Sequence, residues 1–218
     1  MENATVYALW ILASYLAGGI PFGFLIGKMR GIDVRKAGSG NIGATNVFRC
    51  VGRKWGLLAF ALDVAKGLAP VAAARAWGGD LQYLPLAAGG AAVAGHMLTP
   101  YMKFKGGKGV ATAFGMLIGL APGLVAAAFV LFCAVFAVSN YISLASCSAA
   151  AFLAVAVWIP VPFCAAHGGL PFKIFVTAVA AFVVWKHRSN IARLANGTEN
   201  KIYLRHRGGS GAGGAAEK

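Results

Sequence analysis

The sequence predicts an all-α integral membrane protein, and its composition is the first observation that supports this fold class. Of the 218 residues, 59% are hydrophobic and only 12% are charged, whereas a soluble globular domain carries about 25% charged residues. So few charges cannot cover a surface that faces water. We expect one bundle of seven transmembrane helices over residues 1–207, followed by a flexible glycine-rich tail over 208–218.

Seven apolar stretches are candidates for these helices, since a helix needs about 20 apolar residues to cross the hydrocarbon core. In chain order they are Val6–Ile26, Trp55–Trp77, Leu81–Leu98, Val110–Leu120, Gly123–Val138, Ile142–Ile159 and Phe172–Trp185. The first lacks the basic start and the A-x-A site of a signal peptide, so we expect it to be retained. Its end should bend at Pro21 and Gly23, and tryptophans at both ends of the second should anchor it at the two interfaces.

The stretch from Val110 to Val138 is too long for one span. As a single helix it would be about 44 Å long, whereas the hydrocarbon core is about 30 Å thick. The sequence Gly119-Leu-Ala-Pro-Gly123 inside it is a turn signal. We therefore divide the stretch into two helices, the first of which is short.

The distribution of positive charge is the second observation that supports the topology. Seventeen of the 20 Lys and Arg residues lie in three segments, 27–54, 99–108 and 186–218. Seven spans place all three segments on one face, which the positive-inside rule makes the cytoplasmic face, with the N-terminus outside and the C-terminus inside. The net charge of +14 therefore points to anionic lipid headgroups and phosphate ligands rather than to nucleic acid.

The first basic loop, GSGNIGATNVFRCVGRK over 38–54, interleaves glycines with Ser39, Asn41, Thr45 and Asn46. Glycines permit a tight turn whose N–H groups converge on an anion. If the end of the loop is helical, Thr45 and Arg49 share a face. The pattern is not that of a P-loop nucleotide site. An ordinary glycine-rich connector is the alternative.

The second basic loop, KFKGGKG over 103–109, brackets two glycines with Lys105 and Lys108. Lys108 should stand at the N-terminus of the short helix, where the macrodipole disfavours a cation and a bound phosphate would reverse that effect. Thr112 lies one turn further on. A cluster of lysines that flanks a membrane span is the alternative.

The third basic loop, KHRSNIARLANGTENK over 186–201, contains His187, Asn190, Arg193 and Glu199. A histidine titrates in a range suited to proton transfer near neutral pH. Glu199 is one of only six acids in the chain, and we expect it to orient an arginine or a lysine. A solvated charged end of a helix is the alternative.

Ionisable residues also occur within the apolar stretches. Asp63 and Lys66 are three apart, as an i,i+3 pair requires, and His96 ends the third stretch. Such groups are costly at membrane depth and are usually functional or paired. We expect them either to support the site or to hold helices together. No cysteine spacing indicates a metal site, and neither a metal nor a cofactor is expected.

The motifs GSGNIGATNVFR, KGGKGVAT and HRSNIARLANGTENK resemble, in order and spacing, those of the bacterial acyl-phosphate:glycerol-3-phosphate acyltransferase (PlsY) family. The resemblance implies a seven-helix protein of the bacterial cytoplasmic (inner) membrane. It implies transfer of a fatty acyl group from acyl phosphate to the 1-hydroxyl of glycerol 3-phosphate, which gives lysophosphatidic acid and phosphate. One departure is Ser189, where many relatives are expected to have an acidic residue.

The resemblance also implies roles for residues of this chain. It implies catalytic roles for Ser39, Lys108, His187 and Asn190. It implies substrate binding by Gly40, Asn41, Thr45, Asn46, Arg49, Lys105, Gly107, Thr112, Arg193 and Glu199, with Asp63, Lys66 and His96 in support.

Two other classes of function compete with this one. A transporter or channel for a phosphate-bearing metabolite would also use basic loops and an intramembrane ion pair, but it predicts an internal repeat and polar groups near the midplane. We find no clear repeat, and the polar groups collect at one face. The third class is a binding or assembly protein without chemistry.

Overall fold

The computed structural model describes residues 2–160 and 169–203, and this part of the chain is helical, with no strand among the described residues. The proposed tail over 208–218 lies outside the described residues, as do residues 204–207. The helices are α1 Glu2–Gly19, α2 Phe22–Met29, α3 Ala44–Cys50, α4 Arg53–Trp77, α5 Leu84–Met97, α6 Val110–Leu120, α7 Pro122–Ser139, α8 Ile142–Ala156, α10 Gly169–Lys186 and α11 Arg188–Ala195, with a 3₁₀ turn at Pro100–Met102.

Both predicted interruptions of long apolar stretches are confirmed. The first stretch breaks between α1 and α2, where Pro21 precedes α2. The long stretch breaks at Ala121, so that α6 ends at Leu120 and α7 begins at Pro122. Proline has no N–H to donate to the preceding turn, which accounts for a break at each of these prolines. Pro122 is in addition the first residue of α7, a position that favours proline.

Four stretches are long and apolar enough to cross a membrane, namely Asn3–Met29, Arg53–Trp77, Pro122–Ser139 and Gly169–Lys186. The prediction of an all-α protein with membrane-spanning helices is therefore supported. The other three predicted spans are also helical, but α5, α6 and α8 have only 14, 11 and 15 residues. The count of seven spans and the sides of the two termini stay predictions.

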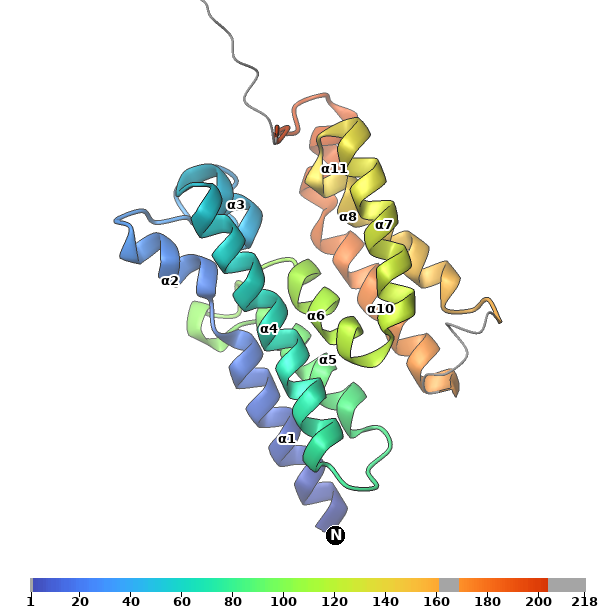
Figure 1. The fold of residues 1–218 in the computed structure, drawn as a ribbon. Helices are drawn as coiled ribbons and strands as arrows, with labels where there is room; N and C mark the ends of the chain where they lie inside the picture. Colours follow the sequence, from blue (N-terminus) through green and yellow to red (C-terminus); the bar gives the residue numbers. More distant parts are fainter. Residues whose placement is uncertain (1, 161–168, 204–218) are drawn as a thin grey trace, which may run out of the picture.

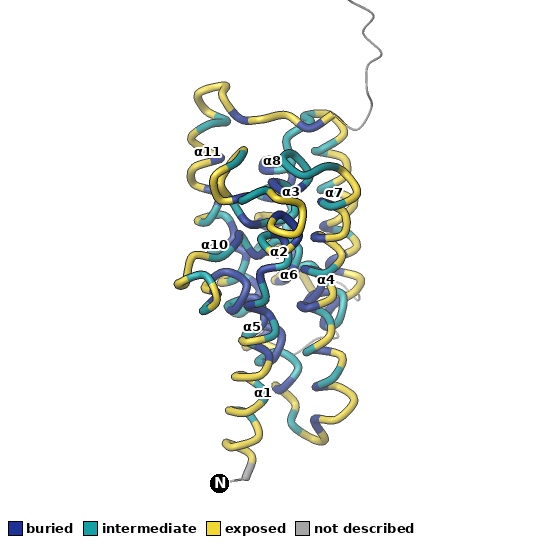
Figure 2. The backbone as a smooth tube through the Cα atoms, turned by 90° about the vertical axis from the view of Figure 1, so that its left-hand side faces the viewer, coloured by how far each residue is buried: buried dark blue, intermediate teal, exposed yellow. Residues whose placement is uncertain are grey.

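Helices α2, α3 and α11 lie at one end of the bundle, and the N-terminus lies at the opposite end (Figure 1). The predicted first basic loop is thus not a simple connector, because it contains a helix of seven residues, α3. Figure 2 shows exposed residues along the outer sides of α1, α4 and α7. Many of these are large and apolar, such as Leu9, Leu57 and Val130, as is expected for surfaces that face lipid.

Close packing between helices depends on small residues. A Cβ on Gly67 would collide with the carbonyl of Thr112, and one on Gly115 with the carbonyl of Val64, so α4 and α6 lie backbone to backbone. Small residues allow this approach in membrane proteins, where dispersion contacts and hydrogen bonds rather than the hydrophobic effect hold helices together. The tight α4–α6 pair fixes the depth at which α6, and therefore Lys108, begins.

Candidate active site

Two adjoining cavities open among the three basic loops, with volumes of about 250 and 210 Å³. Four residues line both of them, namely Ser39, Asn41, Lys108 and Asn190. These four come from all three loops. The fold therefore brings together segments that the sequence separates by long apolar helices, as we expected from the topology.

Lys108 is held by the turn that leads into α6. Gly109 has φ +84°, a left-handed conformation that favours glycine, and it is the N-cap of α6. A Cβ on Gly107 would collide with the ring of His96, so the loop lies directly against that histidine. The Nζ of Lys108 donates a hydrogen bond to Oδ1 of Asn190. Burial lowers the pKa of Lys108 to about 8, against the opposing attraction of Glu199.

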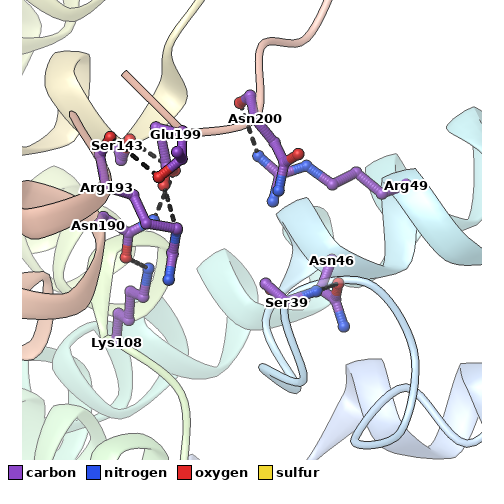
Figure 3. Close-up of polar contacts among 10 residues, drawn as sticks. Ser39, Asn46, Arg49, Lys108, Ser143, Asn190, Arg193, Glu199 and Asn200 are labelled. Carbon is purple, nitrogen blue, oxygen red and sulfur yellow. Dashed lines mark hydrogen bonds and ion pairs between the residues drawn. The ribbon is translucent and has the colours of Figure 1, made fainter. Parts of the chain in front are cut away.

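Glu199 is the acceptor for three hydrogen bonds that order the third loop (Figure 3). Its Oε1 accepts from Asn190 Nδ2 at 2.6 Å and from Ser143 Oγ at 3.0 Å, and its Oε2 accepts from Arg193 Nε at 2.7 Å. Burial raises the pKa of Glu199, but these hydrogen bonds outweigh it and the pKa is lowered overall. The carboxylate fixes the amide of Asn190 so that its oxygen faces Lys108.

The predicted helical end of the first loop is confirmed, and α3 presents both Thr45 and Arg49 to the first cavity. The guanidinium of Arg49 donates to the carbonyl of Asn200 at 3.1 Å. Its Nε is buried and has no hydrogen-bond partner among the residues that the structure describes. The Nε–H group of Arg49 can therefore still donate a hydrogen bond to a bound anion.

Asn46 organises the turn that carries Ser39. It is 1% exposed. Its Oδ1 accepts the N–H of Ser39 at 2.8 Å, while its Nδ2 donates to the carbonyls of Val34 and Ala37 at 2.7 and 3.0 Å. Because the amide oxygen and the amide nitrogen of Asn46 both bind backbone groups, this side chain stabilises the loop from inside.

His187 links α10 to α11 and lines the first cavity. Its Nδ1 lies 2.8 Å from the carbonyl of Val183. Because a carbonyl only accepts, Nδ1 carries the proton and Nε2 is left with a lone pair. Burial, followed by the nearby charge of Lys108, lowers the pKa of His187 to about 4. The imidazole is therefore neutral at pH 7.

The predicted ion pair in α4 is confirmed. Lys66 Nζ lies 2.8 Å from Asp63 Oδ1, and both side chains are buried. Lys66 also donates to the carbonyl of Ile20 at 2.7 Å, between α1 and α2. His96 Nδ1 lies 3.7 Å from the same Asp63 oxygen. Asp63 and His96 line the first cavity, so the pair joins its inner wall to the α1–α2 break.

Five residues of the predicted site lie apart from both cavity linings, namely Gly40, Lys66, Lys105, Gly107 and Thr112. Lys105 is exposed and Thr112 is fully buried. Their assigned roles stay predictions. Conversely, sequence reasoning missed Ser143 and the carbonyl of Asn200, and it counted Lys186 and Arg188, which line the second cavity, only among the charges of the third loop. A serine in an apolar helix such as α8 gives no signal of this kind.

Beyond its polar mouth, the first cavity is apolar. It continues between α6, α7, α8 and α10, where Leu117, Val125, Leu153 and Val179 line it. One continuous space thus joins a cationic centre to a hydrophobic channel inside the bundle.

Comparison with known proteins gives consistent matches over most of the chain. A sequence model of the family described as "Glycerol-3-phosphate acyltransferase" matches residues 8–197. The glycerol-3-phosphate acyltransferase of Trichlorobacter lovleyi is 46% identical over 91% of this chain and 98% of its own length. That of Geotalea daltonii is 46% identical over 87% of this chain and 94% of its own length.

Solved structures resemble the fold as well. The crystal structure of PlsY (YgiH), an integral membrane glycerol 3-phosphate acyltransferase, in its glycerol 3-phosphate form has a TM-score of 0.82 at 36% identity. The lysophosphatidic acid form of that protein has a TM-score of 0.79 at 35% identity. Each match covers 91% of this chain and 96% of the solved chain.

Proposed function

Because the chain belongs to the glycerol-3-phosphate acyltransferase family, we propose that it transfers a fatty acyl group from acyl phosphate to the 1-hydroxyl of glycerol 3-phosphate. The products are lysophosphatidic acid and inorganic phosphate. The reaction takes place at the cytoplasmic face of a bacterial inner membrane, which the protein crosses seven times. The partners are the two substrates and membrane lipids.

The junction of the two cavities is the observation that carries this proposal. An acyl donor needs an apolar space, and its phosphate and that of the acceptor need cations. The apolar channel and the cations meet at Ser39, Asn41, Lys108 and Asn190. In this arrangement the Ser39–Asn41 turn and Asn190 hold the donor phosphate, and Arg49 and Lys108 hold the phosphate of the acceptor.

An acyl phosphate is already activated, so no acyl-enzyme is required. The acceptor hydroxyl oxygen attacks the acyl carbon and forms the new ester bond, while the bond from that carbon to the phosphate oxygen breaks. Phosphate leaves, and the hydroxyl proton is taken up by Nε2 of His187 or by the departing phosphate itself. Lys108 and the donors around it stabilise the developing oxyanion.

The direct test supplies the purified protein with palmitoyl phosphate and glycerol 3-phosphate and measures lysophosphatidic acid and phosphate. Equal amounts of both products are expected, with no product from palmitoyl-CoA. Turnover with palmitoyl-CoA but not with palmitoyl phosphate would refute the proposed donor. Absence of turnover combined with uptake of glycerol 3-phosphate into liposomes would favour a transporter instead.

Direct transfer predicts that Ser39 never carries the acyl group. Mass spectrometry of protein denatured during turnover should give the unmodified mass. Ser39→Ala should lower the rate by about 10²-fold, as for the loss of one donor to a developing anion. Ser139→Ala removes a hydroxyl that donates to the carbonyl of Val135 and accepts the N–H of Tyr141. Because Ser139 is outside both cavity linings, this variant should change little. An acyl group trapped on Ser39 would overturn direct transfer.

The activity should depend on pH through Lys108 and His187. Below about pH 8 Lys108 is protonated and attracts phosphate, so kcat/KM should fall as pH rises above this value. Below about pH 4 His187 is protonated and cannot accept a proton, so kcat/KM should also fall there. The measurement is a pH profile of kcat/KM for both substrates.

Lys108→Arg is the control for the alkaline side, since arginine stays protonated throughout this range. If the variant is active, its kcat/KM should no longer decline above pH 8. Any change near pH 6 comes from the second ionisation of the substrate phosphates and should be the same in both proteins. An alkaline decline that is unchanged in Lys108→Arg would exclude Lys108 as its source.

A further inference from the structure

Residues 199–203 follow α11 without regular secondary structure and connect the two sides of the cationic centre. We call this segment the strap. Glu199, its first residue, is fixed to α8 and α11 by the three hydrogen bonds described above. The carbonyl of the next residue, Asn200, accepts from Arg49 on α3 at 3.1 Å (Figure 3). The strap therefore contacts both sides of the site within two residues.

The far end of the strap is anchored by Ile202. Its side chain is only 5% exposed, whereas Lys201 and Tyr203 on either side of it are exposed. The N–H of Ile202 donates to the carbonyl of Asn140, the residue that ends α7, at 2.9 Å. Burial of an apolar side chain offsets the entropy that is lost when an irregular segment is ordered. Ile202 thus fixes the strap to the turn between α7 and α8.

Arg49 depends on the strap for its orientation. Its side chain is long and loses much rotamer freedom when it is held in one position. One terminal nitrogen is held by Asn200, while Nε, which is buried and has no partner among the described residues, remains for an anion in the first cavity. Arg53 likewise donates to the carbonyl of Tyr203 at 3.4 Å. A cation that is already held in place binds its ligand at a smaller entropic cost.

We propose that Ile202 is a positioning residue for the acceptor site. Ile202 lies outside both cavity linings, but it keeps the carbonyl of Asn200 in place, and that carbonyl holds Arg49 in the geometry that binds phosphate. The inference rests on the proposed function for the ligand of Arg49, which is the phosphate of glycerol 3-phosphate. Release of the strap at Ile202 weakens the binding of the acceptor. The donor side is unaffected, because Glu199 keeps its own hydrogen bond to Asn190.

The first experiment measures steady-state kinetics with palmitoyl phosphate and glycerol 3-phosphate. Ile202→Ala should raise the KM for glycerol 3-phosphate about tenfold, as expected when one hydrogen bond to a charged group is weakened. The kcat and the KM for palmitoyl phosphate should stay near those of the parent. Ile202→Pro removes the N–H that Asn140 accepts and should act in the same direction. Ile202→Val keeps a buried branched side chain and should behave like the parent.

Tyr203→Ala is the matched control, because it removes an exposed side chain from the same segment and leaves the backbone carbonyl in place. It should not change the KM for glycerol 3-phosphate. If Ile202→Ala and Ile202→Pro change kcat and both KM values together, or leave all three unchanged, Ile202 does not position the acceptor site. An effect of Tyr203→Ala equal to that of Ile202→Ala would also overturn the inference.

A double-mutant cycle tests whether Ile202 acts through Arg49. If it does, the variant with both Ile202→Ala and Arg49→Ala should have the same KM for glycerol 3-phosphate as Arg49→Ala alone, since the two changes remove one interaction. A further rise in the double variant, equal to the rise that Ile202→Ala causes in the parent, would show that Ile202 acts by another route and would overturn the inference.

The second experiment does not depend on turnover. Phenylglyoxal, which modifies guanidinium groups, is added to the protein in lipid nanodiscs, and mass spectrometry follows the modification of Arg49. Ile202→Ala should speed this modification and Tyr203→Ala should not, while glycerol 3-phosphate should slow it in the parent. An unchanged rate in Ile202→Ala would overturn the inference, whatever reaction the protein catalyses. A faster rate in Ile202→Ala without protection by glycerol 3-phosphate would support the positioning of Arg49 and would refute its acceptor role in the proposed function.

Discussion

Replacing Lys108 with alanine is expected to lower kcat/KM for acyl transfer by about 10³-fold while the protein stays folded, as for the removal of a group that stabilises a developing anion. Lys108 lines both cavities and donates to Asn190. Its loss therefore removes a positive charge that is proposed to bind the acceptor phosphate and to stabilise the developing oxyanion. Steady-state kinetics with each substrate in turn measures the effect.

Lys103→Ala is the matched control, because Lys103 belongs to the same loop but is exposed and outside both cavities. It should reduce kcat/KM by less than about threefold, as is typical of a screened surface charge. Arg49→Ala should mainly raise the KM for glycerol 3-phosphate. Near-normal transfer by Lys108→Ala would remove Lys108 from the mechanism. An equal loss in Lys103→Ala would mean that general surface charge, rather than this contact, is responsible.

Replacing Asp63 with asparagine is expected to destabilise the protein by about 3–5 kcal/mol, because it leaves Lys66 buried without its counter-ion. The side chains of this pair are only 3% and 5% exposed. For a chain of this size such a loss corresponds to a fall in Tm of about 10 °C. Thermal unfolding in one fixed detergent, followed by circular dichroism, measures it.

Two comparisons make the Asp63 result specific. Asp33 and Arg35 form an exposed ion pair with 29% and 49% side-chain exposure, so Asp33→Asn should leave Tm almost unchanged. The double variant Asp63→Leu with Lys66→Met replaces both charges by apolar groups and should recover much of the lost stability. If Asp63→Asn has the same Tm as the parent protein, the ion pair has no structural role. The contact of Asp63 with the cavity would then be its only function.

The sequence was sufficient for the features that depend on local chemistry. The break at Ala121 could be predicted because Gly119, Pro122 and Gly123 all disfavour a continuous helix. The ion pair in α4 could be predicted because the spacing of Asp63 and Lys66 is fixed by the helix itself. The three loops could be predicted to lie together because they contain most of the Lys and Arg residues and because seven spans place all three on the same face of the membrane.

Other features depend on tertiary contacts that have no local signature. Lys105 and Lys108 look equivalent in the sequence, but only Lys108 reaches the cavities, because the turn at Gly109 directs it inwards. Gly107 suggested a backbone that binds phosphate, whereas the ring of His96 occupies the space beside it. Ser143 faces Glu199 only because α8 begins beside the third loop.

The hydrogen bond between Arg49 and Asn200 joins positions 151 residues apart, and that between Lys108 and Asn190 joins positions 82 residues apart. Contacts of such long range form late, because the intervening chain must first be ordered. During synthesis the N-terminal parts of a protein are made and begin to fold first. During synthesis the first two basic loops are therefore exposed at the membrane surface before Glu199, their counter-charge, has been made. The cationic centre is complete only after α10 has been made and inserted.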